Sequence, residues 1–323
     1  MRRPSIIRPL SSASSTRNAL ATTYRIREKL STIIDEAIRD RDLLYVLEKN
    51  TLGRMGQMMF LKDARINQMR LTGGWQNRWL PCSVGSANFL FDCWDLHDAV
   101  QLAEIQSQGS YEPSVTRFLL TALERGDKFV NVGANNGYFA ILGSICTGTE
   151  GSVWAFEPSE SAYTRLVRNL GLNESRNVIP VRKGAWSRSG KLVFNISGMS
   201  DAWNSAYDLV RPKKRVSVEV VALDDVLPIA EYKLMLIDAE GAEPDILKGA
   251  SRTIDLTKYV VLEWARFNFP TRELHRRLEF YKSIGEVYVL GHQHPSGSLR
   301  ILGPVSTPSE IPTLSNLLLV PST

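Results

Sequence analysis

Three carboxylates stand close together in the sequence Ile237-Asp-Ala-Glu-Gly-Ala-Glu243, directly after an apolar segment. Clustered carboxylates raise one another's pKa, so one of them can act as a general base, or several can hold a hard cation. Asp238 and Glu240 are therefore the candidate catalytic residues. Glu243 is open to two interpretations: it contacts the substrate, or it stabilises the N-terminus of the following helix, which Asp238 would then cap.

A second candidate for a functional site is the loop Asn131-Val-Gly-Ala-Asn-Asn-Gly137, which follows an apolar, β-branched stretch and precedes a helical pattern. A strand–turn–helix order of this kind brings a backbone close to a small ligand, and glycine is needed where a Cβ would block the approach. The dinucleotide fingerprint Gly-x-Gly-x-x-Gly is not matched, because Asn135 and Tyr138 occupy its second and third glycine positions. S-adenosylmethionine (SAM) has no pyrophosphate, and its carboxylate can accept hydrogen bonds from backbone N–H groups after Gly133 and from the helix N-terminus.

Glu157 lies twenty positions after Gly137, at the end of the next predicted strand. The carboxyl ends of adjacent parallel strands border one crevice, so this side chain could bind both ribose hydroxyls of an adenosine. The alternative is that Glu157 is a helix-capping acid ahead of Pro158. The loop and the acid together predict an adenosine site.

Regularly alternating elements must position these residues. Helix-length segments separate most of the predicted strands, which indicates a mostly parallel sheet with helices on both faces. Residues 191–196 and 215–221 predict a hairpin around an insertion rich in serine and aromatic residues. Strands are predicted at 128–132, 152–157, 178–182, 234–237, 259–263, 287–290 and 317–320, and helices at 111–124, 138–146, 161–172, 244–254 and 271–284.

The chain is predicted to contain three parts. Residues 1–18 are rich in arginine and serine and lie ahead of the first acidic residue, Glu28, so we expect a disordered basic leader. Residues 19–110 are expected to form a helical extension, with two helices between about 23 and 61, and a small cap of short strands within 71–98. Residues 111–323 form the α/β domain that would bind the cofactor.

The composition bounds the class of protein. The hydrophobic fraction of 43% and the charged fraction of 23% are those of a soluble globular protein, and no run of 18 apolar residues predicts a transmembrane helix. The three scattered cysteines suit a reducing compartment, so we expect a cytoplasmic protein, with organellar targeting by the basic leader as the alternative. The net charge is +5, but the basic clusters do not alternate with aromatic residues, so no nucleic-acid partner is expected.

Six motifs resemble, in order and spacing, the FkbM-type SAM-dependent methyltransferases, and the resemblance covers about residues 80–321. The resemblance implies a class I methyltransferase with a seven-stranded Rossmann-like sheet and SAM as cofactor. It also implies methyl transfer to a hydroxyl of a sugar or glycosylated metabolite. The motifs are Asn131-Val-Gly-Ala-Asn-Asn-Gly-Tyr138, Ala155-Phe-Glu-Pro158, Gly184-Ala-Trp-Ser187, Val221-Ala-Leu-Asp-Asp225, Ile237-Asp-Ala-Glu-Gly-Ala-Glu243 and Val261-Leu-Glu263.

The resemblance also implies roles for individual residues. Glu157 would contact the ribose, and the methionine end, the adenine and the substrate would be contacted by separate groups. The methionine end of SAM would be contacted by Gly133, Ala134, Asn135 and Gly137, and the adenine by the Gly184–Ala185 loop. The substrate would be contacted by Tyr111, Glu112 and Glu243. The candidate cofactor site also includes Asn131, Pro158 and Asp238. The family usually has aspartate where this chain has Asn131, so a charge that would attract the cofactor is lost.

Several alternatives to this function stay open. An alcohol is a poor nucleophile until it is deprotonated, so a base such as Asp238 or a magnesium ion should lie beside the acceptor, although no clear metal site is evident. An NAD(P)-dependent oxidoreductase would share the loop and the acid. A non-catalytic glycan-binding protein on a degenerate methyltransferase fold would account for Asn131. Basic pI alone suggests an RNA methyltransferase, which predicts salt-dependent RNA binding.

Overall fold

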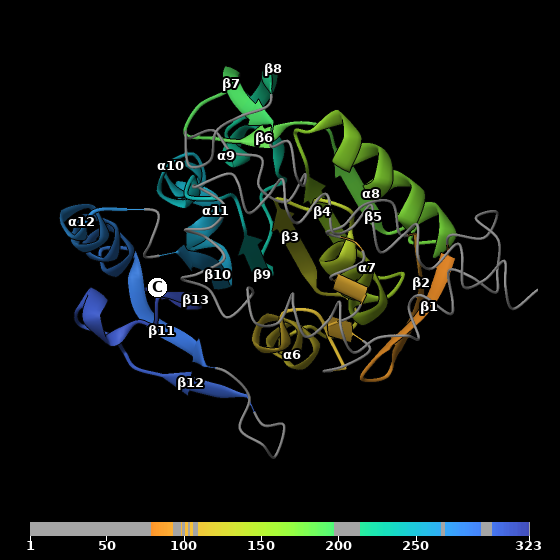
Figure 1. Cartoon of the computed structure of the whole chain (residues 1–323), viewed down its shortest axis with the longest axis horizontal. Coiled ribbons are helices and arrows are strands. Elements are labelled where there is room, and N and C mark those ends of the chain that lie inside the picture. Colours follow the sequence, from red (N-terminus) through yellow and green to blue (C-terminus); the bar gives the residue numbers. More distant parts are fainter. Residues whose placement is uncertain are drawn as a thin grey trace, which may run out of the picture. The chain divides into compact units, whose positions relative to one another are not determined.

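Eight strands form the main sheet, in the order β12-β11-β13-β10-β9-β3-β4-β5 (Figure 1). The five strands from β10 to β5 are parallel to one another, and β13 is antiparallel to both β10 and β11. The strands are β3 (Lys128–Val132), β4 (Ser152–Phe156), β5 (Val178–Val181), β9 (Tyr232–Ile237), β10 (Thr257–Ala265), β11 (Gly285–Gly291), β12 (Arg300–Leu302) and β13 (Leu314–Pro321). The predicted α/β fold with a mostly parallel sheet is confirmed.

The seven predicted strands are all present, and β12 is an eighth strand at the edge. It was not predicted because its three residues are exposed and show no apolar alternation. The sequence also predicted one helix over 244–254, where the structure has α10 (Glu243–Lys248) and α11 (Ser251–Asp255). The helix breaks at Gly249, where a Cβ would lie 2.0 Å from the backbone oxygen of Trp186.

The computed structural model describes residues 79–92, 98, 101–102, 104–105, 109–196, 214–265, 269–291 and 299–322. The chain divides into two compact units, Met1–Asn77 and Arg78–Thr323, and all the described residues belong to the second. The predicted leader at 1–18, the predicted helices between 23 and 61 and the insertion between the hairpin strands lie outside the described residues. Among the described residues, no helix combines the length and the apolar character needed to cross a membrane.

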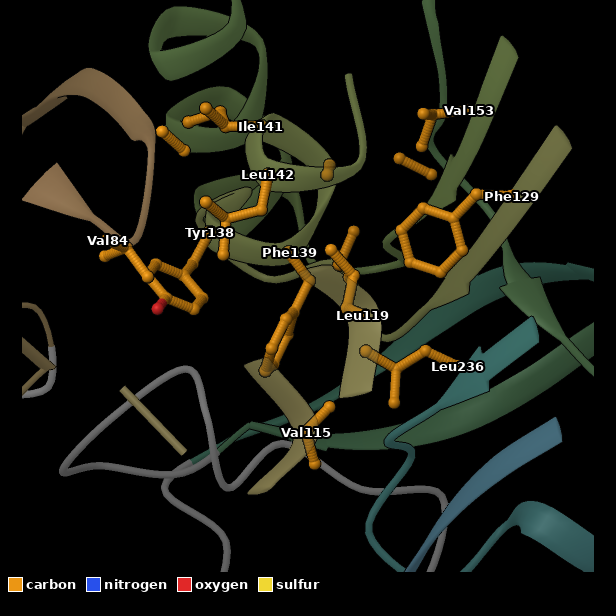
Figure 2. Packing of buried hydrophobic residues seen from close by; sticks show 14 of the residues in the cluster. Val84, Val115, Leu119, Phe129, Tyr138, Phe139, Ile141, Leu142, Val153 and Leu236 are labelled. Atoms are coloured by element: carbon orange, nitrogen blue, oxygen red, sulfur yellow. The ribbon is translucent and has the colours of Figure 1, made fainter. Parts of the chain in front are cut away.

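Side chains alternate between the two faces of the sheet and build two cores. On one face, Phe129 packs with α6 (Pro113–Ala122), α7 (Tyr138–Thr147) and α8 (Glu160–Leu172); Figure 2 shows part of this cluster. On the other face, Val130 packs with α10, α11 and α12 (Thr271–Lys282). The loops at the carboxyl ends of the strands therefore start from a rigid, buried framework.

Two smaller sheets complete the unit. The hairpin of β1 (Trp79–Val84) and β2 (Ala87–Asp92) belongs to the first core; Val84 lies beside Tyr138 in Figure 2. The second small sheet has the order β6-β8-β7, with β6 (Gly184–Ala185), β7 (Gly190–Ile196) and β8 (Lys214–Val221), and its antiparallel β7–β8 pair confirms the predicted hairpin. The predicted division of the chain at residue 111 stays a prediction.

Candidate cofactor and catalytic site

A row of polar side chains crosses the carboxyl end of the sheet on the face that carries α6 and α7. The register pairs Ile237 of β9 with Leu262 of β10, and Glu263 with Asn316 of β13. Asp238 follows Ile237, so continuing the register by one residue places it beside Glu263. Since side chains two residues apart share a face, the side chains of Asp238, Glu263 and Asn316 lie on the same side as Leu236, Val261 and Leu318 of the first core.

Gly133 is where the loop after β3 touches the loop after β9. Its φ is +78°, and a Cβ at this position would lie 1.7 Å from the backbone oxygen of Asp238. The backbone N–H groups of Gly133 and Ala134 both donate to the oxygen of Phe156, at 3.0 and 2.9 Å. Only glycine fits this approach of the two backbones. The predicted contact of the loop with the cofactor stays a prediction.

Glu157 ties two loops together. Its buried carboxylate accepts hydrogen bonds from the backbone N–H of Asn135, at 2.9 Å, and of Ser159, at 2.8 Å. Ser159 is the N-cap of α8, so the hydrogen bond from its N–H supports the interpretation of Glu157 as a helix-capping acid. A carboxylate oxygen can accept more than one hydrogen bond. The ribose role stays a prediction.

Asn131 has a polar side chain in an apolar setting. It lies on β3, two residues before Gly133, and is 1% exposed. Within the part of the chain that the structure describes, neither its Nδ2 nor its Oδ1 has a hydrogen-bond partner. A buried amide without partners costs about 1–3 kcal/mol of stability. A ligand that offers one donor and one acceptor at this point would remove that cost.

Three half-buried carboxylates lie together in the row. Oxygens of Asp238, Glu240 and Glu263 all fall within 4.8 Å of one another, a spacing that could hold a divalent cation. Burial, and then the charge of Glu243, raises the pKa of Asp238 to about 7. Burial, together with the neighbouring carboxylates, also raises the pKa of Glu240 and of Glu263 well above the usual range. Asp238 is therefore poised to exchange a proton near neutral pH.

Glu112 joins this group from the start of α6. Burial, followed by the charge of Asp238, raises its pKa to about 8, against hydrogen bonds from the side chains of Tyr111 and Asn316 that lower it. Its backbone has a φ of 41°, which is uncommon outside glycine, and its N–H donates to the carboxylate of Glu104. The structure thus brings the predicted substrate contacts Tyr111 and Glu112 to the predicted catalytic residue.

Glu243 has contacts of a structural kind. It is 2% exposed and accepts hydrogen bonds from the backbone N–H of Gly241 at 3.1 Å and of Ala239 at 3.3 Å. Arg277 of α12 lies 3.5 Å from its carboxylate and also donates to the oxygen of Gly241 at 2.8 Å. These contacts support the structural interpretation, in which Glu243 shapes the loop that carries Asp238.

The predicted adenine region is also assembled. Gly184, in β6, lies beside Pro158: a Cβ on Gly184 would be 3.6 Å from the proline ring. Ala185 is buried in the second core, while Gly184 is half-buried. The loops after β4 and before β7 therefore meet at Pro158, next to Glu157.

Three residues of the site were not predicted from the sequence. Glu263 stands at the end of a buried strand, the same signal that pointed to Asp238, and it could have been found in this way. Asn316 acts through its hydrogen bond to Glu112. Glu104 has no motif around it, and nothing in the sequence pairs it with a residue eight positions later.

Comparison with known proteins identifies the domain. Residues 131–288 match the family model described as the methyltransferase FkbM domain. The hexuronic acid methyltransferase AglP of Haloferax volcanii is 30% identical over 155 residues, which are 47% of this chain and 62% of that protein. The 2-O-methyltransferase NoeI of Sinorhizobium fredii is 26% identical over 170 residues, or 47% of this chain and 69% of that protein. The match thus spans less than two thirds of the first relative.

Among solved structures, a SAM-dependent O-methyltransferase of Thermotoga maritima aligns at 12% identity and a TM-score of 0.40, over 76% of this chain and 78% of its own. The family match and the mostly parallel sheet together confirm the predicted class I methyltransferase fold. Residues 131–288 therefore carry a methyltransferase FkbM domain.

Proposed function

We propose that this protein transfers a methyl group from SAM to a hydroxyl group of a sugar or glycosylated metabolite. The observation that carries the proposal is the buried amide of Asn131, which has no hydrogen-bond partner among the described residues and lies beside Gly133, where a loop of the methyltransferase domain leaves no room for a side chain. The names of two relatives, a hexuronic acid methyltransferase and a 2-O-methyltransferase, support the acceptor class.

The residues present fit the cofactor. The amide of Asn131 offers a donor and an acceptor to the amino-acid end of SAM, and the backbone from Gly133 to Gly137 passes beside it. The carboxylate of Glu157, next to this loop, is the acceptor for the ribose hydroxyls, and Pro158 with Gly184 borders the position for the adenine. When bound, SAM supplies a methyl group that is activated by its sulfonium.

Asp238 is the base in this proposal. The acceptor oxygen attacks more readily when its proton is removed, and the pKa of Asp238, raised to about 7 by burial and the charge of Glu243, suits that transfer near neutral pH. Glu112 and Glu263 flank Asp238 and offer oxygen atoms to further hydroxyls of the acceptor. Glu240 stays in reach to exchange a proton with Asp238, because its carboxylate lies within 4.8 Å of that of Asp238.

Mass spectrometry of glycans and glycosylated metabolites tests the function and the acceptor class together. Cells that lack the gene are compared with cells complemented by the wild type, by Asp238→Asn, or by the control Asp127→Asn. Asp127 is a carboxylate outside the site that accepts the backbone N–H of Glu124 at 2.8 Å. We expect one additional methyl group on a defined sugar with the wild type and the control, and its loss with Asp238→Asn. Identical profiles with and without the gene would refute the proposal.

A further inference from the structure

The side chain of Asn136, in the middle of the glycine loop, lies in a buried polar network. It is 1% exposed, and its Nδ2 donates to Oδ1 of Asp98 at 2.7 Å and to Oε1 of Gln101 at 2.8 Å. Asp98 and Gln101 are themselves buried and helical. Both lie upstream of residue 131, where the family domain begins. Residues outside the matched domain therefore hold a residue of its glycine loop.

The backbone of Asn136 is held as well. Its oxygen accepts a hydrogen bond from Nδ2 of Asn169 in α8 at 2.8 Å, and Oδ1 of Asn169 accepts the backbone N–H of Asp92 in β2 at 2.9 Å. Asn169 is fully buried. The middle of the loop is thus fixed on two sides, by the residues at 98 and 101 and by α8 with the hairpin behind it.

The neighbours of Asn136 are the predicted cofactor contacts. Asn135 has a φ of 46° and directs its N–H to Glu157, and Gly137 has a φ of 96° and passes so close to Leu166 that a Cβ would lie 2.8 Å from its Cδ1. A positive φ at a residue other than glycine, as at Asn135, is retained only where the surroundings hold it. Asn136 stands between Asn135 and Gly137 and makes buried side-chain contacts that hold this part of the loop.

We propose that Asn136 is a positioning residue, which fixes the loop from Gly133 to Gly137 in its cofactor-binding shape by anchoring it to Asp98 and Gln101. The proposal rests on the proposed function, because it assigns the loop to SAM. It gives the segment that precedes the family domain a part in cofactor affinity, through contacts with the loop and without a contact to the cofactor.

The substitution Asn136→Asp tests this with almost no change in shape. It replaces a group that donates two hydrogen bonds by one that only accepts, opposite the oxygens of Asp98 and Gln101. We expect the dissociation constant of S-adenosylhomocysteine, measured by calorimetry, to rise at least about tenfold. In the protein without cofactor, hydrogen exchange of the peptide that contains residues 133–137 should become faster.

A charge-swapped pair provides the rescue. In Asn136→Asp combined with Asp98→Asn, the new amide at position 98 donates to the new carboxylate at 136, and the amide of Gln101 can rotate to donate from its Nε2. Affinity and slow exchange should both return to within about threefold of the wild type, since both hydrogen bonds are restored with reversed polarity.

Asn177→Asp is the matched control at the other end of α7. Nδ2 of Asn177 donates to the oxygen of Gly148 at 2.7 Å and to Oγ1 of Thr147 at 3.1 Å, so the substitution breaks a comparable amide network away from the loop. We expect it to lower stability and leave the affinity for S-adenosylhomocysteine unchanged.

The results distinguish a failure of this inference from a failure of the proposed function. If the swapped pair does not recover affinity, or if Asn177→Asp weakens binding as much as Asn136→Asp, Asn136 has only a structural role and the inference is wrong. If the wild type does not bind S-adenosylhomocysteine, the proposed function fails. Hydrogen exchange in the cofactor-free protein then still decides whether Asn136 anchors the loop.

Discussion

Replacing Gly133 by alanine should separate the two loops that form the site. A Cβ at this position would lie 1.7 Å from the oxygen and 2.9 Å from the carbonyl carbon of Asp238, whereas real Cβ contacts shorter than 3.0 Å essentially never occur. The loops must therefore move apart by about 1.3 Å. That movement displaces Asp238 from the site that Gly133 helps to form.

The expected loss of stability has two parts. Alanine in the left-handed conformation that Gly133 adopts, with a φ of +78°, costs about 1–2 kcal/mol. The separation also stretches the 3.0 Å hydrogen bond from the N–H of Asp238 to the oxygen of Val132, whose loss adds about 1 kcal/mol. Gly133→Ala should thus lower the free energy of unfolding by about 2–3 kcal/mol, measured by urea denaturation.

Gly126→Ala separates the two parts. Gly126 has a φ of +87°, and nothing lies within 4 Å of the position of its Cβ, so alanine there incurs the conformational cost of about 1–2 kcal/mol alone. We expect Gly126→Ala to bind S-adenosylhomocysteine like the wild type and Gly133→Ala to bind it at least about tenfold more weakly. Equal stability and equal affinity of the two variants would refute the reasoning, because the contact with Asp238 would then have no consequence.

Three further predictions concern the carboxylates. Asp238→Asn should leave the affinity for S-adenosylhomocysteine within about threefold and slow methyl transfer by about 10²–10⁴-fold, measured with the identified acceptor; lost affinity would reassign the residue. The pKa of Glu112 is raised from 4.5 to about 8 in the folded protein, so its contribution to stability is complete below about pH 4.5 and disappears as the pH rises through 8. Urea denaturation at a series of pH values should show this fall, and Glu112→Gln should reduce it; an unchanged slope would contradict the burial of this group. Glu243→Ala removes one of two carboxylates beside the buried Arg277, which keeps Glu273 at 3.2 Å, and also removes the acceptor of the N–H groups of Gly241 and Ala239. It should cost about 2–4 kcal/mol, whereas Glu279→Ala, at an exposed pair with Lys282, should cost less than about 1 kcal/mol in the same measurement.

The elements were predictable because their signals are local. Buried strands such as β9 are continuous apolar runs, and the glycines after β3 mark a turn that other residues cannot make. The carboxyl ends of parallel strands meet at one edge, so Asp238 and the loop at Gly133 could be placed together from the sequence. The exposed strand β12 carries no such signal.

The balance of contacts within the site was not predictable. Glu243 is assigned a structural role by Arg277, which lies 34 positions later in the sequence, and no local pattern pairs them. The sequence showed that Asn131 replaces an aspartate usual in the family. It did not show that the amide lacks a hydrogen-bond partner among the described residues, because this depends on the side chains of neighbouring strands. Glu112 combines an unusual backbone with contacts to Glu104 and Asn316, and these contacts are set by the assembled fold.

The most direct test of the cofactor site is a calorimetric titration of the wild type and Asn131→Leu with S-adenosylhomocysteine, with urea denaturation of both. Leucine removes a buried amide that has no partner among the described residues, so the cofactor-free variant should be more stable by about 1 kcal/mol or more. We predict that the wild type binds one molecule per chain and that the variant binds at least about tenfold more weakly. Absence of binding by the wild type, or equal affinity of the two proteins, would contradict the assignment of this crevice to SAM.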